Sequence, residues 1–171
     1  MSIWFSKSEQ FSELFKSYKT QKIQDQNWNA VWESSYDMVT IDTRCVVRAP
    51  FYEKQDNIQY DIVIMPKMSF GTAHHETTHL MLSYLLDLEV QDKSFLDMGS
   101  GTAVLAILAR MKGASPVTAV DNDEWAYNNA LENVEKNNFQ DINVILGDKS
   151  TIEGMNFEII FANINRNILL A

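Results

Sequence analysis

The clearest pattern of apolar and polar positions in this chain lies between residues 95 and 121. Residues 95–98 form a short apolar run, which is typical of a buried parallel strand, and residues 117–120 form a second one. Between them, Gly99-Ser100-Gly101 predicts a turn that needs residues without a Cβ. Residues 103–111 are strong helix formers. The pattern therefore predicts a strand, a glycine turn, a helix and a second strand that ends at Asp121.

Similar runs extend this unit into an α/β sheet. We expect four strands, at residues 94–98, 117–121, 142–146 and 157–162. Because strands alternate with helical segments, the sheet should be parallel and Rossmann-like.

The pattern before residue 68 predicts smaller elements. Residues 1–22 carry apolar side chains at a spacing of three and four, which predicts an amphipathic helix, and Trp28 and Trp32 share one helix face. Residues 38–48 and 58–65 read as strands joined by a hairpin-like loop. We expect residues 1–36 to be a helical segment and linker, and residues 37–171 to be the main domain.

Composition and net charge exclude some classes of function and favour others. The chain of 171 residues is 46% hydrophobic, which suits a globular core, and its net charge of −9 argues against binding along nucleic-acid phosphates. That charge instead favours a basic protein partner. A single cysteine, Cys45, suits the reducing cytoplasm, and neither a signal peptide nor a membrane-spanning run is present.

The glycine turn favours a nucleoside cofactor over a dinucleotide. A dinucleotide fingerprint places a third glycine at the position of Val104. Asp97 lies two residues before the first glycine, where a carboxylate would repel a pyrophosphate but would suit a ligand with an amino group and a sulfonium. An ordinary strand–helix turn without a ligand is the alternative.

The three histidines support a competing hypothesis. His75-Glu76-Thr77-Thr78-His79 matches the H-E-x-x-H pattern of zinc peptidases. Zinc would need a third ligand, and Asp87 and Glu89 belong to the same predicted helix. We therefore expect no metal, and we expect the histidines to be polar residues at the mouth of a cofactor site.

The motifs resemble those of a known family. The D-x-G-x-G turn is similar to motif I of class I S-adenosylmethionine-dependent methyltransferases. Residues 68–72 with Thr77-Thr78 resemble the M-x-F-G-T…T-T segment of the PrmA-type methyltransferases, which modify the eleventh protein of the large ribosomal subunit. Arg48-Ala49-Pro50-Phe51 and Ala162-Asn163-Ile164 fit the same family in the same order.

The resemblance implies the cofactor S-adenosylmethionine and a set of binding residues. Asp121 would hold the ribose hydroxyls, Gly99 would let the methionine part approach the backbone, and Asp148 is a candidate for the adenine amino group or is simply a turn residue. The full set of cofactor-binding candidates is Thr78, Asp97, Gly99, Gly101, Asp121, Asp148 and Asn163.

The implied reaction is methyl transfer to a lysine or N-terminal amine of a basic ribosomal protein. Asn163 is the candidate catalytic residue, since its side chain can orient a neutral amine, and no dedicated base is expected.

Three departures from the family are visible. Ala73 and Ala103 replace family glycines, and Met65 replaces a usual glutamate. A methyl group at either alanine is expected to crowd the cofactor or to require a backbone conformation that alanine disfavours, and in both cases cofactor affinity would suffer.

Length is a further departure. The family's sheet has seven strands and four are predicted here, so we expect a chain truncated at both ends with an apolar sheet edge that invites self-association. The alternative function is a non-catalytic S-adenosylmethionine-binding module.

Overall fold

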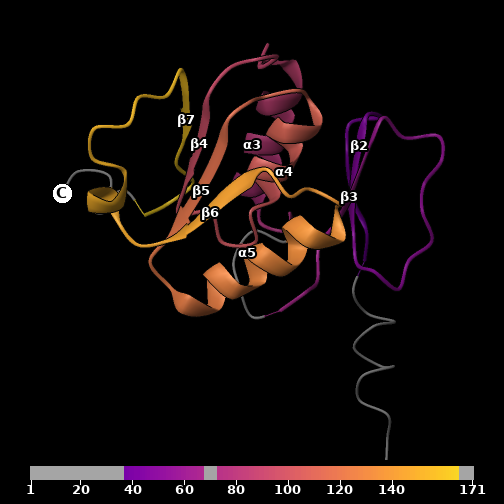
Figure 1. Ribbon diagram of the computed structural model, residues 1–171. Coiled ribbons are helices and arrows are strands. Elements are labelled where there is room, and N and C mark those ends of the chain that lie inside the picture. Colours follow the sequence, from indigo (N-terminus) through magenta and orange to yellow (C-terminus); the bar gives the residue numbers. More distant parts are fainter. Residues whose placement is uncertain (1–36, 68–72, 166–171) are drawn as a thin grey trace, which may run out of the picture.

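The computed structural model describes residues 37–67 and 73–165 as an α/β fold (Figure 1). The elements in chain order are β1 Val39–Ile41, β2 Cys45–Arg48, β3 Tyr60–Val63, α3 Glu76–Asp87, β4 Phe95–Met98, α4 Val104–Met111, β5 Val117–Asp121, α5 Glu124–Lys136, β6 Ile142–Leu146, the 3₁₀ helix η2 Lys149–Ile152, and β7 Ile159–Phe161. The predicted N-terminal helix, the tryptophan pair and the motif at 68–72 lie outside the described residues. The domain division at residue 36 therefore stays a prediction.

The main sheet confirms the predicted α/β class. Its order is β6-β5-β4-β7, and all neighbouring strands are parallel. Each predicted strand is present, although β7 is shorter than the expected 157–162. The chain moves from β4 to β5 and β6 in one direction, and then β7 returns to the other side of β4. The strand order thus reverses beside β4, and open α/β sheets bind ligands at such a reversal, outside the carboxyl ends of the strands.

The small sheet contradicts two predictions about residues 38–65. Residues 38–48 are not one strand but a hairpin, since β1 and β2 are antiparallel around a turn in which Asp42 has φ 51°. The predicted hairpin between this segment and residues 58–65 is wrong, because β2 and β3 are parallel. The connection between the two strands is bonded to them at Asp61. Arg48 Nε donates to Asp61 at 2.7 Å and Gln55 N donates to Asp61 Oδ2 at 3.0 Å.

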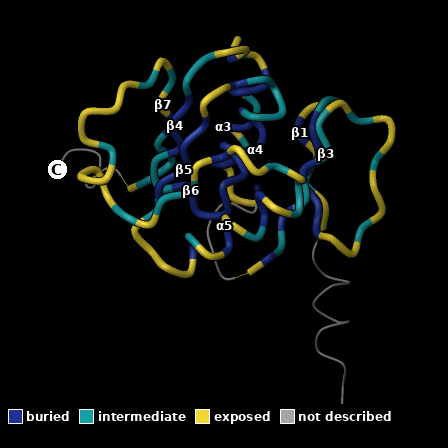
Figure 2. The backbone as a smooth tube through the Cα atoms, in the orientation of Figure 1, coloured by how far each residue is buried: buried dark blue, intermediate teal, exposed yellow. Residues whose placement is uncertain are grey.

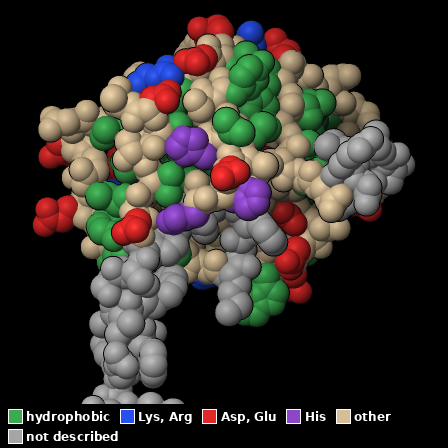
Figure 3. Space-filling model, turned by 180° about the vertical axis from the view of Figure 1, so that it is seen from behind, with side chains coloured by type: hydrophobic (Ala, Val, Ile, Leu, Met, Phe, Trp, Pro, Cys, Tyr) green, Lys and Arg blue, Asp and Glu red, His purple; other side chains and the backbone are tan. Residues whose placement is uncertain are grey.

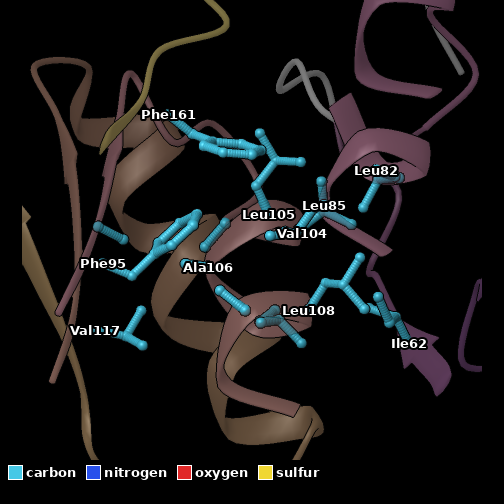
Figure 4. Packing of buried hydrophobic residues seen from close by; sticks show 14 of the residues in the cluster. Ile62, Leu82, Leu85, Phe95, Val104, Leu105, Ala106, Leu108, Val117 and Phe161 are labelled. Atoms are coloured by element: carbon cyan, nitrogen blue, oxygen red, sulfur yellow. The ribbon is translucent and has the colours of Figure 1, made fainter. Parts of the chain in front are cut away.

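Helix α4 forms the centre of the core. Its residues 104–109 are all buried, because the helix contacts α3, α5, the main sheet and β3. A helix that is apolar on every side is expected in such a position. Figure 4 shows Leu105 facing Phe161, and Leu108 pointing toward Ile62. The rings of Phe95 and Phe161, with centroids 5.1 Å apart, join β4 to β7.

Burial separates this core from its connections. Figure 2 shows buried residues in the central strands and α4, and exposed residues along the loop between β2 and β3 and the segment between β6 and β7. In the part of the chain that the structure describes, no helix has the length and apolar character needed to cross a membrane.

Candidate functional site

The glycine turn follows β4 at the reversal of strand order. Gly99 has φ 70° and Gly101 has φ 55°. The backbone amides of Gly99 and Ser100 both donate to the carbonyl of Val120, at 2.8 and 3.0 Å. A Cβ on Gly99 would lie 2.0 Å from Ile164 Cγ2. Conformation and space therefore both require glycine at position 99.

Asp121 ends β5 and contacts the same turn. Its Oδ2 accepts a hydrogen bond from Gly101 N at 2.8 Å, and its Oδ1 accepts one from Asp123 N at 3.0 Å. The carboxylate therefore stabilises the glycine turn in addition to the ribose role expected for it, and that role stays a prediction.

Thr78 and Asn163 come together although they lie 85 residues apart in the chain. Asn163 Nδ2 donates to Thr78 Oγ1 at 3.1 Å. Thr78 is the third residue of α3 and is 3% exposed, while Asn163 follows β7 by two residues and is partly buried. The contact joins the first turn of α3 to the carboxyl end of β7. Two of the predicted site residues therefore meet at the reversal of strand order.

Asp97 lies beneath the turn. It is 1% exposed, and its Oδ2 accepts a hydrogen bond from Ala106 N at 3.2 Å. Ala103, the N-cap residue of α4, has no side chain that can accept this bond, so Asp97 satisfies a helix donor from the neighbouring strand. Burial raises the pKa of Asp97, the backbone hydrogen bond from Ala106 lowers it, and the nearby charge of Asp121 raises it. The net result is a pKa of about 7.

Asp148 lies farther out. It is exposed and caps η2, accepting hydrogen bonds from Ser150 N at 2.9 Å and Ser150 Oγ at 2.7 Å. These bonds lower the pKa of Asp148. Asp148 is thus a turn residue, as one of the two alternatives predicted. Its role in binding the adenine amino group stays a prediction.

The glycine turn has the features expected of a ligand-facing loop. Ser100 is 6% exposed, and in the described part of the chain its Oγ is the one buried side-chain oxygen or nitrogen without a hydrogen-bond partner. Buried hydroxyl groups are normally satisfied. This unpaired hydroxyl, next to two glycines in left-handed conformations, fits a polar cofactor at this place.

The two alanines that replace family glycines both have a left-handed backbone conformation, which is unfavourable for alanine. Ala73 has φ 66° and Ala103 has φ 62°, and their exposures are 1% and 0%. A left-handed conformation costs an L-residue roughly 1–2 kcal/mol. The fold therefore keeps the glycine backbone at both positions, which is the second of the two alternatives, and the effect on cofactor affinity stays a prediction.

The histidines form a group on one face of the molecule (Figure 3). His75 is not inside α3 but caps it: Thr77 N donates to His75 Nδ1 at 3.3 Å, and Thr77 Oγ1 lies 2.7 Å from the same atom. His74 Nε2 lies 3.0 Å from the carbonyl oxygen of Asp37. Within residues 37–67 and 73–165, no three His, Cys, Asp or Glu side chains form a group that could hold a metal ion. The described residues therefore give the zinc hypothesis no support.

Sequence reasoning missed three asparagines: Asn129 and Asn133 within α5, and Asn137 at its C-cap. The first two are fully buried, and Asn133 Nδ2 donates to the carbonyl of Thr102 in the glycine turn at 3.1 Å. Asparagine is a poor residue for a helix interior, so its recurrence every four residues was the available signal.

Comparison with known proteins shows the family of the chain. The family model "Ribosomal protein L11 methyltransferase (PrmA)" matches residues 3–171. A curated ribosomal protein L11 methyltransferase of Bacteroides thetaiotaomicron is 51% identical over 156 residues, which cover 90% of this chain and 56% of that protein. The relative from Chlorobaculum parvum, with the same name, is 43% identical over 85% of this chain and 52% of its own length.

A solved structure shows the same fold. The ribosomal protein L11 methylase of Lactobacillus delbrueckii subsp. bulgaricus superposes with a TM-score of 0.70 at 26% identity, covering 79% of this chain and 69% of that one. The present chain spans about half the length of the curated relatives it matches. Because the family model matches from residue 3 to residue 171 and so includes every candidate site residue, the chain belongs to the ribosomal protein L11 methyltransferase (PrmA) family.

Proposed function

We propose that this chain forms the cofactor-binding part of an S-adenosylmethionine-dependent methyltransferase acting on amino groups of ribosomal protein L11. The observation that carries the proposal is the hydrogen bond between Asn163 and Thr78 at the reversal of strand order. Family membership supports it, because the relatives are named for methylation of that protein.

The residues around the glycine turn would hold the cofactor. Gly99 and Gly101 give the turn its left-handed backbone, and Ser100 supplies an unpaired hydroxyl. Thr78, in the first turn of α3, is suited to the cofactor's carboxylate because a helix N-terminus favours anions. Asp97, Asp121 and Asp148 are assigned to the cationic groups, the ribose and the adenine, respectively. When bound, S-adenosylmethionine supplies a methyl group activated by its sulfonium.

Asn163 is assigned to the reacting amine. Its Nδ2 is already engaged by Thr78 Oγ1, so its Oδ1 is left to accept a hydrogen bond from the substrate nitrogen. Such a bond orients the nitrogen lone pair, and orientation is the main requirement when the electrophile is already activated. The substrate amine loses its proton to water before it reacts, so no side chain acts as a dedicated base.

We infer a basic partner from the net charge of the chain and a cytoplasmic location from its free thiol. A net charge of −9 attracts a basic ribosomal protein. Cys45 is a free, buried thiol, which is compatible with the cytoplasm, where ribosomal proteins are made.

Self-association remains a separate proposal. In the described residues β7 pairs only with β4, and Ile160 on β7 is 60% exposed. Light scattering over a concentration series would test it, and a mass that stays monomeric throughout would exclude it.

Two measurements test the function. The first is calorimetric titration of the chain with S-adenosylhomocysteine, and the second is transfer of labelled methyl groups to purified ribosomal protein L11. We expect binding of the nucleoside and its loss in Asp121→Ala. No binding by the wild-type chain would refute the cofactor site, while binding without transfer would leave only a cofactor-binding module.

Two variants test whether Asn163 is the catalytic residue. Asn163→Ala should reduce methyl transfer by about 100-fold, because a misplaced reacting group can cost that much. The control is His75→Ala, which removes a helix cap and should lower stability by about 1 kcal/mol with little loss of transfer. Equal loss in the two variants would show that the role given to Asn163 is wrong.

A further inference from the structure

Three asparagines, called here the asparagine row, lie along one face of α5 and its C-cap. They are Asn129, Asn133 and Asn137, spaced by four residues, and their side chains bond to one another and to the α5 backbone. Asn133 Nδ2 donates to Asn129 Oδ1 at 2.9 Å, and Asn137 Nδ2 donates to the carbonyl of Asn133 at 2.7 Å. Asn129 and Asn133 are fully buried.

The asparagine row bonds the segment that leaves β3. Val63 N donates to Asn137 Oδ1 at 2.9 Å, and Asn137 Nδ2 donates to the carbonyl of Val63 at 2.7 Å. Met65 N donates to Asn133 Oδ1 at 2.8 Å, while Ile64 N between them bonds to Arg48 on the other side. Two side-chain amides therefore take the place of a neighbouring strand.

Asn133 also reaches the glycine turn. Its Nδ2 donates to the carbonyl of Thr102 at 3.1 Å. The side chain of Asn137 bonds to Val63 and to the α5 backbone, so within the described residues the two asparagines differ in this contact.

The contact completes a set of bonds along the turn. Gly99 and Ser100 bond to the carbonyl of Val120, Gly101 bonds to Asp121, and Thr102 bonds to Asn133. Four consecutive residues are thus tied to β5 or α5. The next residue, Ala103, has φ 62°, and such a strained residue persists only where its surroundings determine its conformation.

We propose that Asn133 is a positioning residue for the cofactor site: it holds the Thr102 carbonyl and so keeps the glycine turn in its binding shape. This inference rests on the proposed function, since it assumes that the turn binds S-adenosylmethionine. Asn133 itself need not touch the cofactor.

A matched pair of substitutions tests the proposal. Asn133→Asp and Asn137→Asp each keep an oxygen for the amide of Met65 or Val63, and each loses two donated hydrogen bonds. Only the first change places a carboxylate against the Thr102 carbonyl. Asn133→Ala and Asn137→Ala form a second pair in case a buried carboxylate prevents folding.

The readouts separate positioning from stability. Urea unfolding measures stability, and calorimetric titration with S-adenosylhomocysteine, at a temperature where every variant is folded, measures affinity. We expect Asn133→Asp to weaken the affinity by about tenfold or more and Asn137→Asp by less than about twofold, because only the former removes the hydrogen bond that Asn133 donates to the Thr102 carbonyl and sets a carboxylate against it.

The failures of the two proposals can be told apart. If the wild-type chain does not bind the nucleoside, the proposed function is refuted, and so is this inference. If the wild-type chain binds and the affinities of the two variants change equally, the role of Asn133 is structural only and the inference is wrong.

Discussion

At the scale of single residues, the site depends on backbone conformations that its side chains do not favour. Ala103 occupies a left-handed conformation at the start of α4, where the family has glycine. Three effects of changing it to glycine nearly cancel: relief of roughly 1–2 kcal/mol of strain, loss of a buried methyl worth about 0.8 kcal/mol, and an entropic cost of about 0.5–1 kcal/mol.

The first prediction follows from this balance. Ala103→Gly should change the free energy of unfolding by less than about 0.5 kcal/mol. Ala106→Gly is the control, since Ala106 is equally buried but lies inside α4, and it should lose about 2 kcal/mol from methyl burial and helix propensity together. Urea denaturation of both variants measures the difference, and equal losses would show that residue 103 is not strained.

Asp97 makes stability depend on pH. Burial raises its folded pKa from 3.8 to about 7, so the folded state keeps a proton that the unfolded state releases. The stability that Asp97 contributes should be complete below pH 3.8 and should be lost as pH rises through about 7.

The matching variant is Asp97→Asn, which keeps an oxygen for Ala106 N but has no charge. Wild-type stability relative to this variant should fall between pH 4 and about 7 and should be level above that range. Urea denaturation across this pH range is the measurement. A constant difference across the range would mean that Asp97 ionises normally.

At the scale of elements, backbone groups at helix ends form hydrogen bonds with side chains that lie outside the helix. Asp97 of β4 serves the start of α4, and Lys112 serves the end of α3, where its Nζ donates to the carbonyls of Leu85, Leu86 and Leu88. A cation at a helix C-terminus satisfies carbonyls that have no partner within the helix and also complements the helix dipole. Such contacts fix how α3 packs against α4, and α3 carries Thr78.

Lys112→Met should therefore destabilise the protein by about 1–2 kcal/mol, less than a fully buried charged group would, because Lys112 is partly exposed. Lys67→Met is the control, since its ion pair with Glu132 is at the surface and should contribute no more than about 1 kcal/mol. Thermal unfolding followed by circular dichroism compares the two. A larger loss from Lys67→Met would contradict this account of α3.

At the scale of the whole molecule, the parallel sheet brings the candidate residues together. Gly99 and Asp121 follow adjacent strands, β4 and β5, and Asn163 follows β7 on the other side of β4. The carboxyl ends of parallel strands share one edge of the sheet, so residues far apart in the chain meet there. The acidic charge of the molecule is the second property at this scale, because it acts on partners at a distance.

The net charge of −9 predicts how the proposed partner binds. The association rate with ribosomal protein L11, measured by surface plasmon resonance, should fall by about tenfold or more between roughly 50 and 500 mM salt, since salt screens the attraction. Affinity for S-adenosylhomocysteine, for which we propose a site at the glycine turn, should change far less. A rate independent of salt would exclude electrostatic attraction as the source of recognition.

The sequence alone determined the features that depend on local patterns. Apolar runs located the four strands of the main sheet, and the run 103–111 located α4, because a buried strand and an all-apolar helix are recognisable from their own residues. The positive φ of Ala73 and Ala103 was one of two alternatives that the glycine motifs of the family suggested, since backbone conformation is preserved where the fold requires it.

Only the tertiary structure decided which segments meet. The parallel pairing of β2 and β3, the asparagine row and the bond between Asn163 and Thr78 each join residues whose contact no local pattern encodes. A strand pattern shows which faces are apolar but not the direction of the partner strand, and an asparagine is polar whether its amide is bonded by water or by a buried backbone. Those choices depend on the packing of distant elements, so they appear only in the folded chain.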